Sequence, residues 1–274
     1  MPSCHPMNYV YDGSFEGFLC CVFESYQRKE VPSEIFAGEP EQLSFSLCRR
    51  IETDSAKALR VLASIPKKIS PRVEETVRLC FLSCHPEKEL LLLKYLRKGY
   101  RYGAAVEKQL ADPVVSEVNK AVLFIKNESH LLTGFIRFSE FGGVLVSVIH
   151  PKNFVLPVIQ SHFCERYPNE AFFIYDAVHK TALYYCKGKC QYINIDSFEM
   201  PPAGREESFY RALWKRYYDT IAVEGRENPR CRMSHMPKRY WSDMTEFTQQ
   251  EHESIDHCGG DLSNLLKDGK VNYG

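Results

Sequence analysis

Hydrophobic positions near the N-terminus first form a short strand-like run and then recur at helical spacing. Tyr9–Tyr11 predicts a strand, and the turn residues Asp12-Gly13-Ser14 follow it. Over Phe15–Arg28, apolar residues return every three or four positions, which predicts a helix with one buried face. Ser14 is placed to cap this helix, because its hydroxyl can accept from the free amides of the first turn.

The pattern then becomes predominantly helical. Two prolines and a glycine in Glu30–Glu41 predict a surface loop, and a short strand is expected at Leu43–Leu47. Ser70-Pro71 and Asp112-Pro113 each combine a capping residue with a first-turn proline, ahead of apolar residues at helical spacing. Residues 54–128 are therefore predicted to form a helical bundle or helical insert.

The periodicity changes at Leu131, where short apolar runs separated by glycine turns begin. They predict five strands, with a helix after the second at Phe154–Arg166: Leu132–Phe138, Val144–Ile149, Ala171–Asp176, Thr181–Cys186 and Gln191–Ile195. The segment therefore reads β-β-α-β-β-β. Because the connections within each cluster of strands are too short for parallel crossovers, an antiparallel sheet is expected.

A long helix is predicted at Glu206–Val223, with an inner side that carries Phe209, Leu213, Trp214, Tyr217 and Ile221. Beyond Phe247 the chain is polar, and Thr248–Gly274 is predicted to be a mobile tail. The fold class that follows is α+β, with one domain over residues 1–247, its helical insert at about 54–128, and the tail at 248–274.

Composition narrows the possible functions. The chain has 274 residues, 44% of them hydrophobic and 13% aromatic, which excludes wholesale disorder. Lys plus Arg and Asp plus Glu each number 35, so any affinity for nucleic acid must come from a local patch. Neither a secretion leader nor an apolar stretch of about 18–20 residues occurs, so no membrane insertion is expected. Eleven cysteines, an odd number, favour a reducing cytoplasmic location.

Two cysteine pairs have a spacing that could suit a metal, namely Cys80/Cys84 and Cys186/Cys190. A four-cysteine site built from both pairs is conceivable, but Cys80 and Cys84 fall on an apolar helix face, where cysteine packs as a small hydrophobe. Core packing is the favoured interpretation, and no metal is expected. The sequence has no nucleotide-binding loop, common hydrolase signature or iron–sulfur cluster motif, so no cofactor is expected either.

Three residues are catalytic candidates: Asp12, Asp176 and His179. Asp176 and His179 stand at the end of a predicted strand and in the turn after it, where an aspartate could tune the proton affinity of a histidine. An aspartate in a turn more often binds the local backbone, and this structural role is favoured for both Asp176 and Asp12.

The most suggestive stretch for binding lies late in the chain, where cationic and aromatic residues gather. Cations can neutralise phosphates, and flat rings can stack on bases. A solvated basic loop, or cations paired within the protein, is an equally weighted interpretation. The candidates are Lys215, Arg216, Arg226, Arg230, Arg232, Lys238, Arg239, Tyr240 and Trp241.

Four segments together resemble a known family: Tyr11–Phe18, Thr133–Phe138, Phe173–His179 and Met236–Trp241. This is the bacterial family of DNA metabolism proteins that partner a radical SAM protein of DNA modification or repair, and the resemblance runs from Tyr9 to about Phe247. In that family the domain also occurs fused to uracil-DNA glycosylase-like domains. The resemblance implies a stand-alone member that acts beside a separate radical SAM enzyme, and it assigns no catalytic residue.

These observations support three hypotheses. The leading one is an accessory protein of DNA repair or DNA modification whose basic and aromatic segment engages DNA or the radical SAM partner. The second is an enzyme that processes damaged bases or nucleotides through Asp176 and His179, with Asp12 in the same pocket. The third is an interaction scaffold for the radical SAM protein that does not bind DNA.

Overall fold

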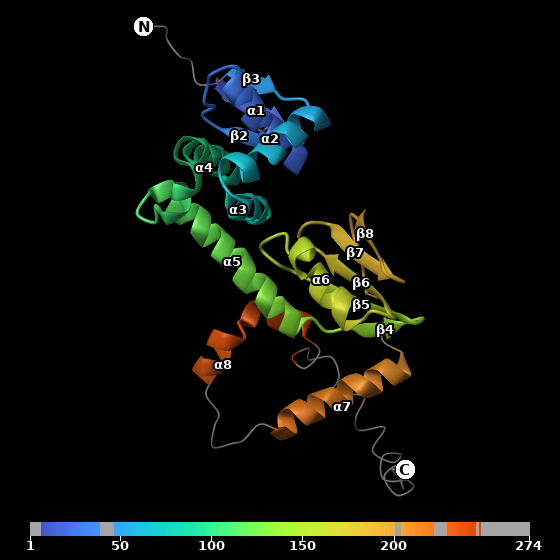
Figure 1. Ribbon diagram of the computed structural model, residues 1–274. Helices are drawn as coiled ribbons and strands as arrows, with labels where there is room; N and C mark the ends of the chain where they lie inside the picture. Colours follow the sequence, from blue (N-terminus) through green and yellow to red (C-terminus); the bar gives the residue numbers. More distant parts are fainter. Residues whose placement is uncertain (1–6, 39–46, 201–203, 222–228, 245–246, 248–274) are drawn as a thin grey trace, which may run out of the picture. The chain divides into compact units, whose positions relative to one another are not determined.

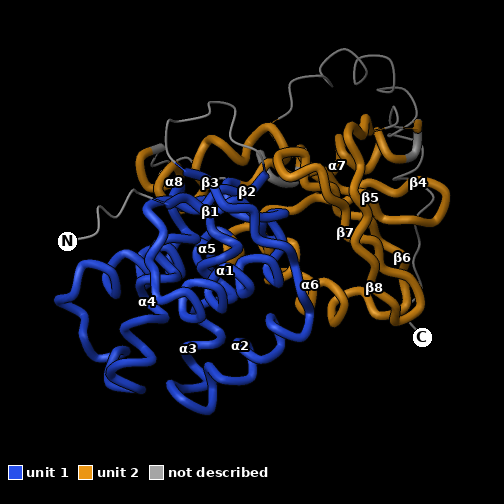
Figure 2. Tube along the Cα trace, turned by 90° about the horizontal axis from the view of Figure 1, so that it is seen from above, with its two compact units in different colours: residues 1–128, 152–155 blue, residues 129–151, 156–274 orange. Residues whose placement is uncertain are grey.

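The computed structural model describes residues 7–38, 47–200, 204–221, 229–244 and 247, drawn as coloured ribbon in Figure 1. Helices and two separate sheets confirm the α+β class. The chain divides into two compact units (Figure 2), unit 1 with residues 1–128 and 152–155, and unit 2 with residues 129–151 and 156–274. The predicted tail Thr248–Gly274 lies outside the described residues.

Unit 1 begins with a three-stranded parallel sheet. The central strand β1 (Met7–Tyr11) pairs with β2 (Ile35–Ala37) on one side and β3 (Leu47–Arg50) on the other. Helix α1 (Phe15–Gln27) connects β1 to β2 and is long enough to return the chain for a parallel pairing. Of the strand predicted at Leu43–Leu47, only Leu47 is described, and it opens β3.

The predicted helical region is confirmed by helices that follow β3. Helix α3 is capped by Ser70, whose Oγ accepts from the Val73 amide at 3.1 Å, and Asp112 accepts from the Val114 amide at 2.9 Å. Both caps agree with the sequence signals. The elements are α2 (Ser55–Lys68), α3 (Pro71–Phe81), α4 (Lys88–Tyr102), the 3-10 helix η1 (Gly103–Lys108) and α5 (Pro113–Phe135).

A buried polar network explains why the short segment 152–155 belongs to unit 1. The Glu128 carboxylate, at 1% residue exposure, accepts from the backbone amides of Lys152 and Asn153 at 3.1 and 2.8 Å. The fully buried Asn153 in turn accepts from the Cys84 amide through Oδ1 at 2.9 Å. These bonds fasten residues 152–155 to α5 and to the end of α3.

Unit 2 contains a five-stranded sheet in the order β4-β5-β6-β7-β8. Its neighbours pair antiparallel, except β5 and β6, which are parallel. The prediction of an antiparallel sheet is therefore wrong for this pair, because α6 between β5 and β6 provides the crossover that a parallel pairing needs. The elements are β4 (Ser139–Phe141), β5 (Val144–Ile149), α6 (Leu156–Arg166), β6 (Ala171–Asp176), β7 (Thr181–Cys186) and β8 (Lys189–Asn194).

The strand predicted at Leu132–Phe138 is also wrong, since α5 continues to Phe135. Ile125, Leu132 and Ile136 are all buried, and their separations of seven and four residues match one helix face. The apolar residues from Leu132 onward therefore belong to the buried side at the end of a long helix. The next strand begins only at Ser139.

Unit 2 ends with α7 (Arg205–Ile221), α8 (Pro229–His235) and the 3-10 helix η3 (Lys238–Asp243). The inner side predicted for α7 is wrong at Phe209 and Leu213, which are 45% and 50% exposed. Trp214 is 42% exposed, and the side chains of Tyr217 and Ile221 lie outside the described residues. Within the described ranges, no helix is both long and apolar enough to cross a membrane.

Candidate nucleic-acid interface

The indole of Trp241 contacts two cationic side chains that come from different elements of unit 2. The Arg232 guanidinium of α8 lies 5.3 Å from the ring centroid, and the Lys238 ammonium of η3 lies 5.8 Å from it. The ring is fixed by stacking on Phe247 at 4.5 Å between centroids, and its Nε1 donates to the Met236 carbonyl at 3.0 Å. A cation held against an aromatic face stays charged and retains its outer donors. Arg232, Lys238 and Trp241, which we call the Trp241 cluster, thus present two cations on one ring.

Tyr240, by contrast, belongs to the core of unit 2. Its residue exposure is 1%, and its ring packs on Phe135 at 5.4 Å between centroids. The sequence predicts an exposed ring for base stacking here, and burial corrects that expectation. The Arg239 guanidinium lies 4.5 Å from the Tyr240 ring, so Tyr240 positions a cation instead.

The predicted cations differ in how exposed their side chains are. Arg230, Arg232, Lys238 and Arg239 are all exposed, which keeps them within reach of a polyanion. On α7, Arg216 is exposed and Lys215 is half-buried. Arg226 lies outside the described residues.

Asp243 is a residue of this region that the sequence reasoning missed. Its carboxylate accepts from the His150 backbone amide at 3.2 Å and lies 2.8 Å from His150 Nδ1. Both oxygens thus face the end of β5, and the side chain is only 10% exposed. The acid therefore anchors η3 to the sheet.

Asp176 and His179 do come together, in the turn between β6 and β7. The buried Asp176 carboxylate accepts from the amides of Val178 and His179, each at 3.0 Å, and lies 2.7 Å from His179 Nδ1. The two backbone bonds are those of an aspartate that organises a turn. The contact to the ring also fixes the orientation of the imidazole, as a catalytic histidine requires.

Asp12 lies in unit 1 and has a local structural role. Its carboxylate accepts from the Ser14 amide at 2.9 Å, and from the hydroxyls of Ser14 and Thr53 at 2.7 Å each. Burial alone would raise the pKa of Asp12, but these hydrogen bonds outweigh it and bring the pKa below its usual value. A Cβ at Gly17 would collide with the same carboxylate, so glycine is required there.

The two cysteine pairs lie in different units, Cys80/Cys84 in unit 1 and Cys186/Cys190 in unit 2. Cys80 is buried in the core of unit 1, whereas Cys84 is exposed. The Cys190 thiol has Cys164 of α6 as its neighbour, with 3.3 Å between the sulfurs. Burial and this second thiol raise the pKa of Cys164 to about 12. No group of three or more His, Cys, Asp or Glu side chains is placed to hold a metal in the ranges that the structure describes.

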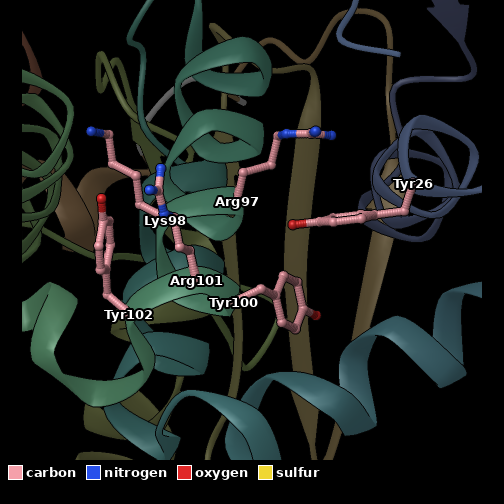
Figure 3. Close-up of a pocket in the computed structure, with 6 residues that line it drawn as sticks. All are labelled: Tyr26, Arg97, Lys98, Tyr100, Arg101 and Tyr102. Carbon is pink, nitrogen blue, oxygen red and sulfur yellow. The ribbon is translucent and has the colours of Figure 1, made fainter. Parts of the chain in front are cut away.

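A second basic and aromatic surface, which the sequence reasoning missed, lies in unit 1 (Figure 3). Tyr26 reaches from α1 toward α4, and its ring meets that of Tyr100 edge-on at 5.6 Å between centroids. The pair borders a hollow of about 450 Å³ and a second hollow of about 610 Å³. We call the lining of the first hollow the α1–α4 surface: Tyr26, Arg97, Lys98, Tyr100, Arg101 and Tyr102. The alternation of Arg, Lys and Tyr from Arg97 to Tyr102 was the available sequence signal.

Comparison with known families gives a match that begins in the loop before α4 and ends just beyond η3. Residues 86–246, more than half of the chain, match the profile of a domain of unknown function, DUF4130. The chain belongs to the DUF4130 family. The matched DUF4130 region contains Arg97–Tyr102, the Asp176 turn and the Trp241 cluster, whereas Tyr26 precedes it.

Other comparisons add little to the DUF4130 assignment. No curated protein matches the chain. Among solved structures, the pGpG-specific phosphodiesterase PggH from Vibrio cholerae is similar over 66% of this chain and 81% of its own, with 11% identity and a TM-score of 0.29. A similarity at that level carries no argument about fold or function.

Proposed function

We propose that this protein is an accessory factor of DNA repair or DNA modification in the bacterial cytoplasm. It binds nucleic acid through the exposed cations of residues 230–241 and works beside a separate radical SAM enzyme. The observation that carries the proposal is the placement of Arg232 and Lys238 on the Trp241 ring, because cations from two elements converge on one aromatic face. The family resemblance of Met236–Trp241 supplies the link to DNA.

The test is fluorescence anisotropy with labelled single-stranded, duplex and uracil-containing DNA at about 50 mM salt, where phosphate contacts are strongest. The variant Arg232→Glu/Lys238→Glu should weaken binding to all sequences about tenfold or more, since it replaces two phosphate-facing cations with acids. A matched control is Arg166→Glu/Lys189→Glu, which makes the same charge change at exposed positions of unit 2 outside the segment. Equal affinities of the two double variants would refute the proposal.

Exposed apolar side chains on α7 favour contact with a partner protein as a second candidate function. Phe209, Tyr210 and Leu213 are between 45% and 58% exposed, and apolar groups gathered on one helix are typical of protein interfaces. Co-purification with the radical SAM protein in the absence of DNA, and its loss in Phe209→Ser/Leu213→Ser, would support this function. Unchanged co-purification of that variant would exclude α7 as the contact.

An enzymatic function is a further candidate, favoured by the contact of 2.7 Å between Asp176 and His179 Nδ1. A histidine whose ring is oriented by a carboxylate can act as a base or acid toward a substrate. His179→Ala should then abolish the processing of lesion-containing DNA by the purified protein while leaving DNA binding intact. Retained processing would eliminate this candidate.

A further inference from the structure

We propose that the α1–α4 surface of unit 1 is a second nucleic-acid site, specific for unpaired nucleotides and separate from the Trp241 cluster. The proposal goes beyond the proposed function, because it concerns another unit and other residues. It rests on charge, ring exposure and the shape of the hollow.

The charge of this surface is strongly one-sided. Arg97, Lys98 and Arg101 lie within five consecutive positions of α4, and the residues that line either hollow include no carboxylate. Lys98 is paired with Asp112, at 2.5 Å between Nζ and Oδ2, which lowers the pKa of that carboxyl. Arg97 and Arg101 therefore give this surface a net positive charge.

The two arginines have aromatic neighbours. The Arg97 guanidinium lies 4.8 Å from the centroid of the Tyr26 ring and donates to Ser25 Oγ at 3.4 Å. Arg101 lies 5.2 Å from the Tyr102 ring. Within the described part of the chain, neither forms an ion pair with a carboxylate. Their planar N–H groups are thus available for the bidentate hydrogen bonds that phosphates accept.

The rings can bind bases. Tyr26 and Tyr102 are 41% and 44% exposed, so part of each ring is open to solvent. Tyrosine rings are neutral at physiological pH and do not repel a phosphate. Stacking on such rings is tolerant of sequence, because every base has a flat face.

Arginines beside exposed tyrosine rings favour single-stranded nucleic acid over other anionic ligands. Duplex bases are already stacked on one another and cannot reach the rings, and an acidic peptide would use the cations but leave the tyrosines without a role. A hollow of about 450 Å³ has the size of a small-molecule site. The second hollow, which shares Tyr26 and Tyr100 and adds Arg60 and Lys68, extends this surface beyond one nucleotide.

The two proposed sites can be tested separately because they lie in different units and share no residue. The full-length chain carrying Arg232→Glu/Lys238→Glu is titrated into labelled (dT)12 and into a labelled hairpin duplex at about 50 mM salt. We expect residual binding of (dT)12 that exceeds binding of the hairpin.

Variants in that background then locate the residual binding. Arg101→Glu should weaken (dT)12 binding about tenfold, whereas Arg72→Glu should leave it unchanged, since Arg72 is 80% exposed and lines neither hollow. Tyr102→Ala should also cause a loss of about tenfold through lost stacking, whereas the control Tyr192→Ala, at 45% exposure, should not. Circular dichroism checks that each variant is folded.

Several outcomes would overturn the proposal of a nucleic-acid site on the α1–α4 surface. They are no residual (dT)12 binding, equal binding of the hairpin, equal effects of Arg101→Glu and Arg72→Glu, or displacement of (dT)12 by poly-glutamate as effectively as by unlabelled (dT)12. Equal affinities of Arg232→Glu/Lys238→Glu and Arg166→Glu/Lys189→Glu would overturn the proposed function and leave this site standing.

Discussion

Asp176 has no solvent-accessible surface and keeps its carboxylate satisfied by groups of its own turn. A buried carboxylate without partners would be costly, so the donors of Val178 and His179 are a condition for its burial. The same residue is therefore a structural element of the β6–β7 turn, whether or not His179 takes part in chemistry.

Removal of this carboxylate should destabilise the protein. Asp176→Ala leaves the backbone amides of Val178 and His179 without this acceptor, and we expect a loss of about 1–3 kcal/mol in the free energy of unfolding. His179→Ala removes only the contact to a half-buried ring and should cost less. Urea unfolding monitored by circular dichroism measures both variants, and equal losses would contradict the assigned turn role.

At the scale of elements, the pairing of α1 with α2 depends on a nearly buried acid. Glu24 of α1 lies 2.9 Å from Lys57 of α2 and 2.9 Å from Arg28 of its own helix. The hydrogen bond from Lys57 is the main cause that lowers the pKa of Glu24, and the bond from Arg28 adds to it, against the effect of burial.

This arrangement predicts a pH dependence of stability. The pKa of Glu24 is lower in the folded state than its usual value of 4.5, so its stabilising contribution is present above that value and is lost as the pH falls through the folded pKa. Glu24→Gln should reduce the free energy of unfolding by about 1 kcal/mol at pH 7, because both cations are partly exposed, and by less at pH 3. A loss that is equal at both pH values would contradict this assignment.

Local signals in the sequence predicted most of the elements and their caps. Ser14, Ser70 and Asp112 cap helices as expected, because capping depends on a few adjacent atoms. The parallel pairing of β5 with β6 was missed, since strand direction depends on where α6 returns the chain. The run at Leu132 was assigned to a strand because a short aliphatic stretch does not distinguish a strand from the buried face of a helix.

The candidate site was predicted only in part, because the sequence shows local clustering but not contacts between distant residues. Clustering of cations along residues 230–241 was visible in the sequence, but the burial of Tyr240 depends on Phe135, more than a hundred positions away. The α1–α4 surface was missed because Tyr26 and Arg97 come together only in the folded unit.

For the whole molecule, a net charge of zero means that binding strength comes from local clusters. Affinity for single-stranded DNA should therefore fall on the order of tenfold between about 50 and 200 mM salt, as expected for a few phosphate contacts. Anisotropy titrations at four salt concentrations give the slope. An affinity independent of salt would mean that the exposed cations make no phosphate contacts.

The path of the chain limits how this protein can be divided. Residues 152–155 return to unit 1 between two stretches of unit 2, and Asn153 satisfies the buried Glu128 from there. A fragment that stops at residue 128 would lack Asn153, and one that starts at residue 129 would expose a buried amide and its flanking loop. Neither half can be excised with one cut, so expression of an isolated unit calls for a grafted or circularly permuted chain.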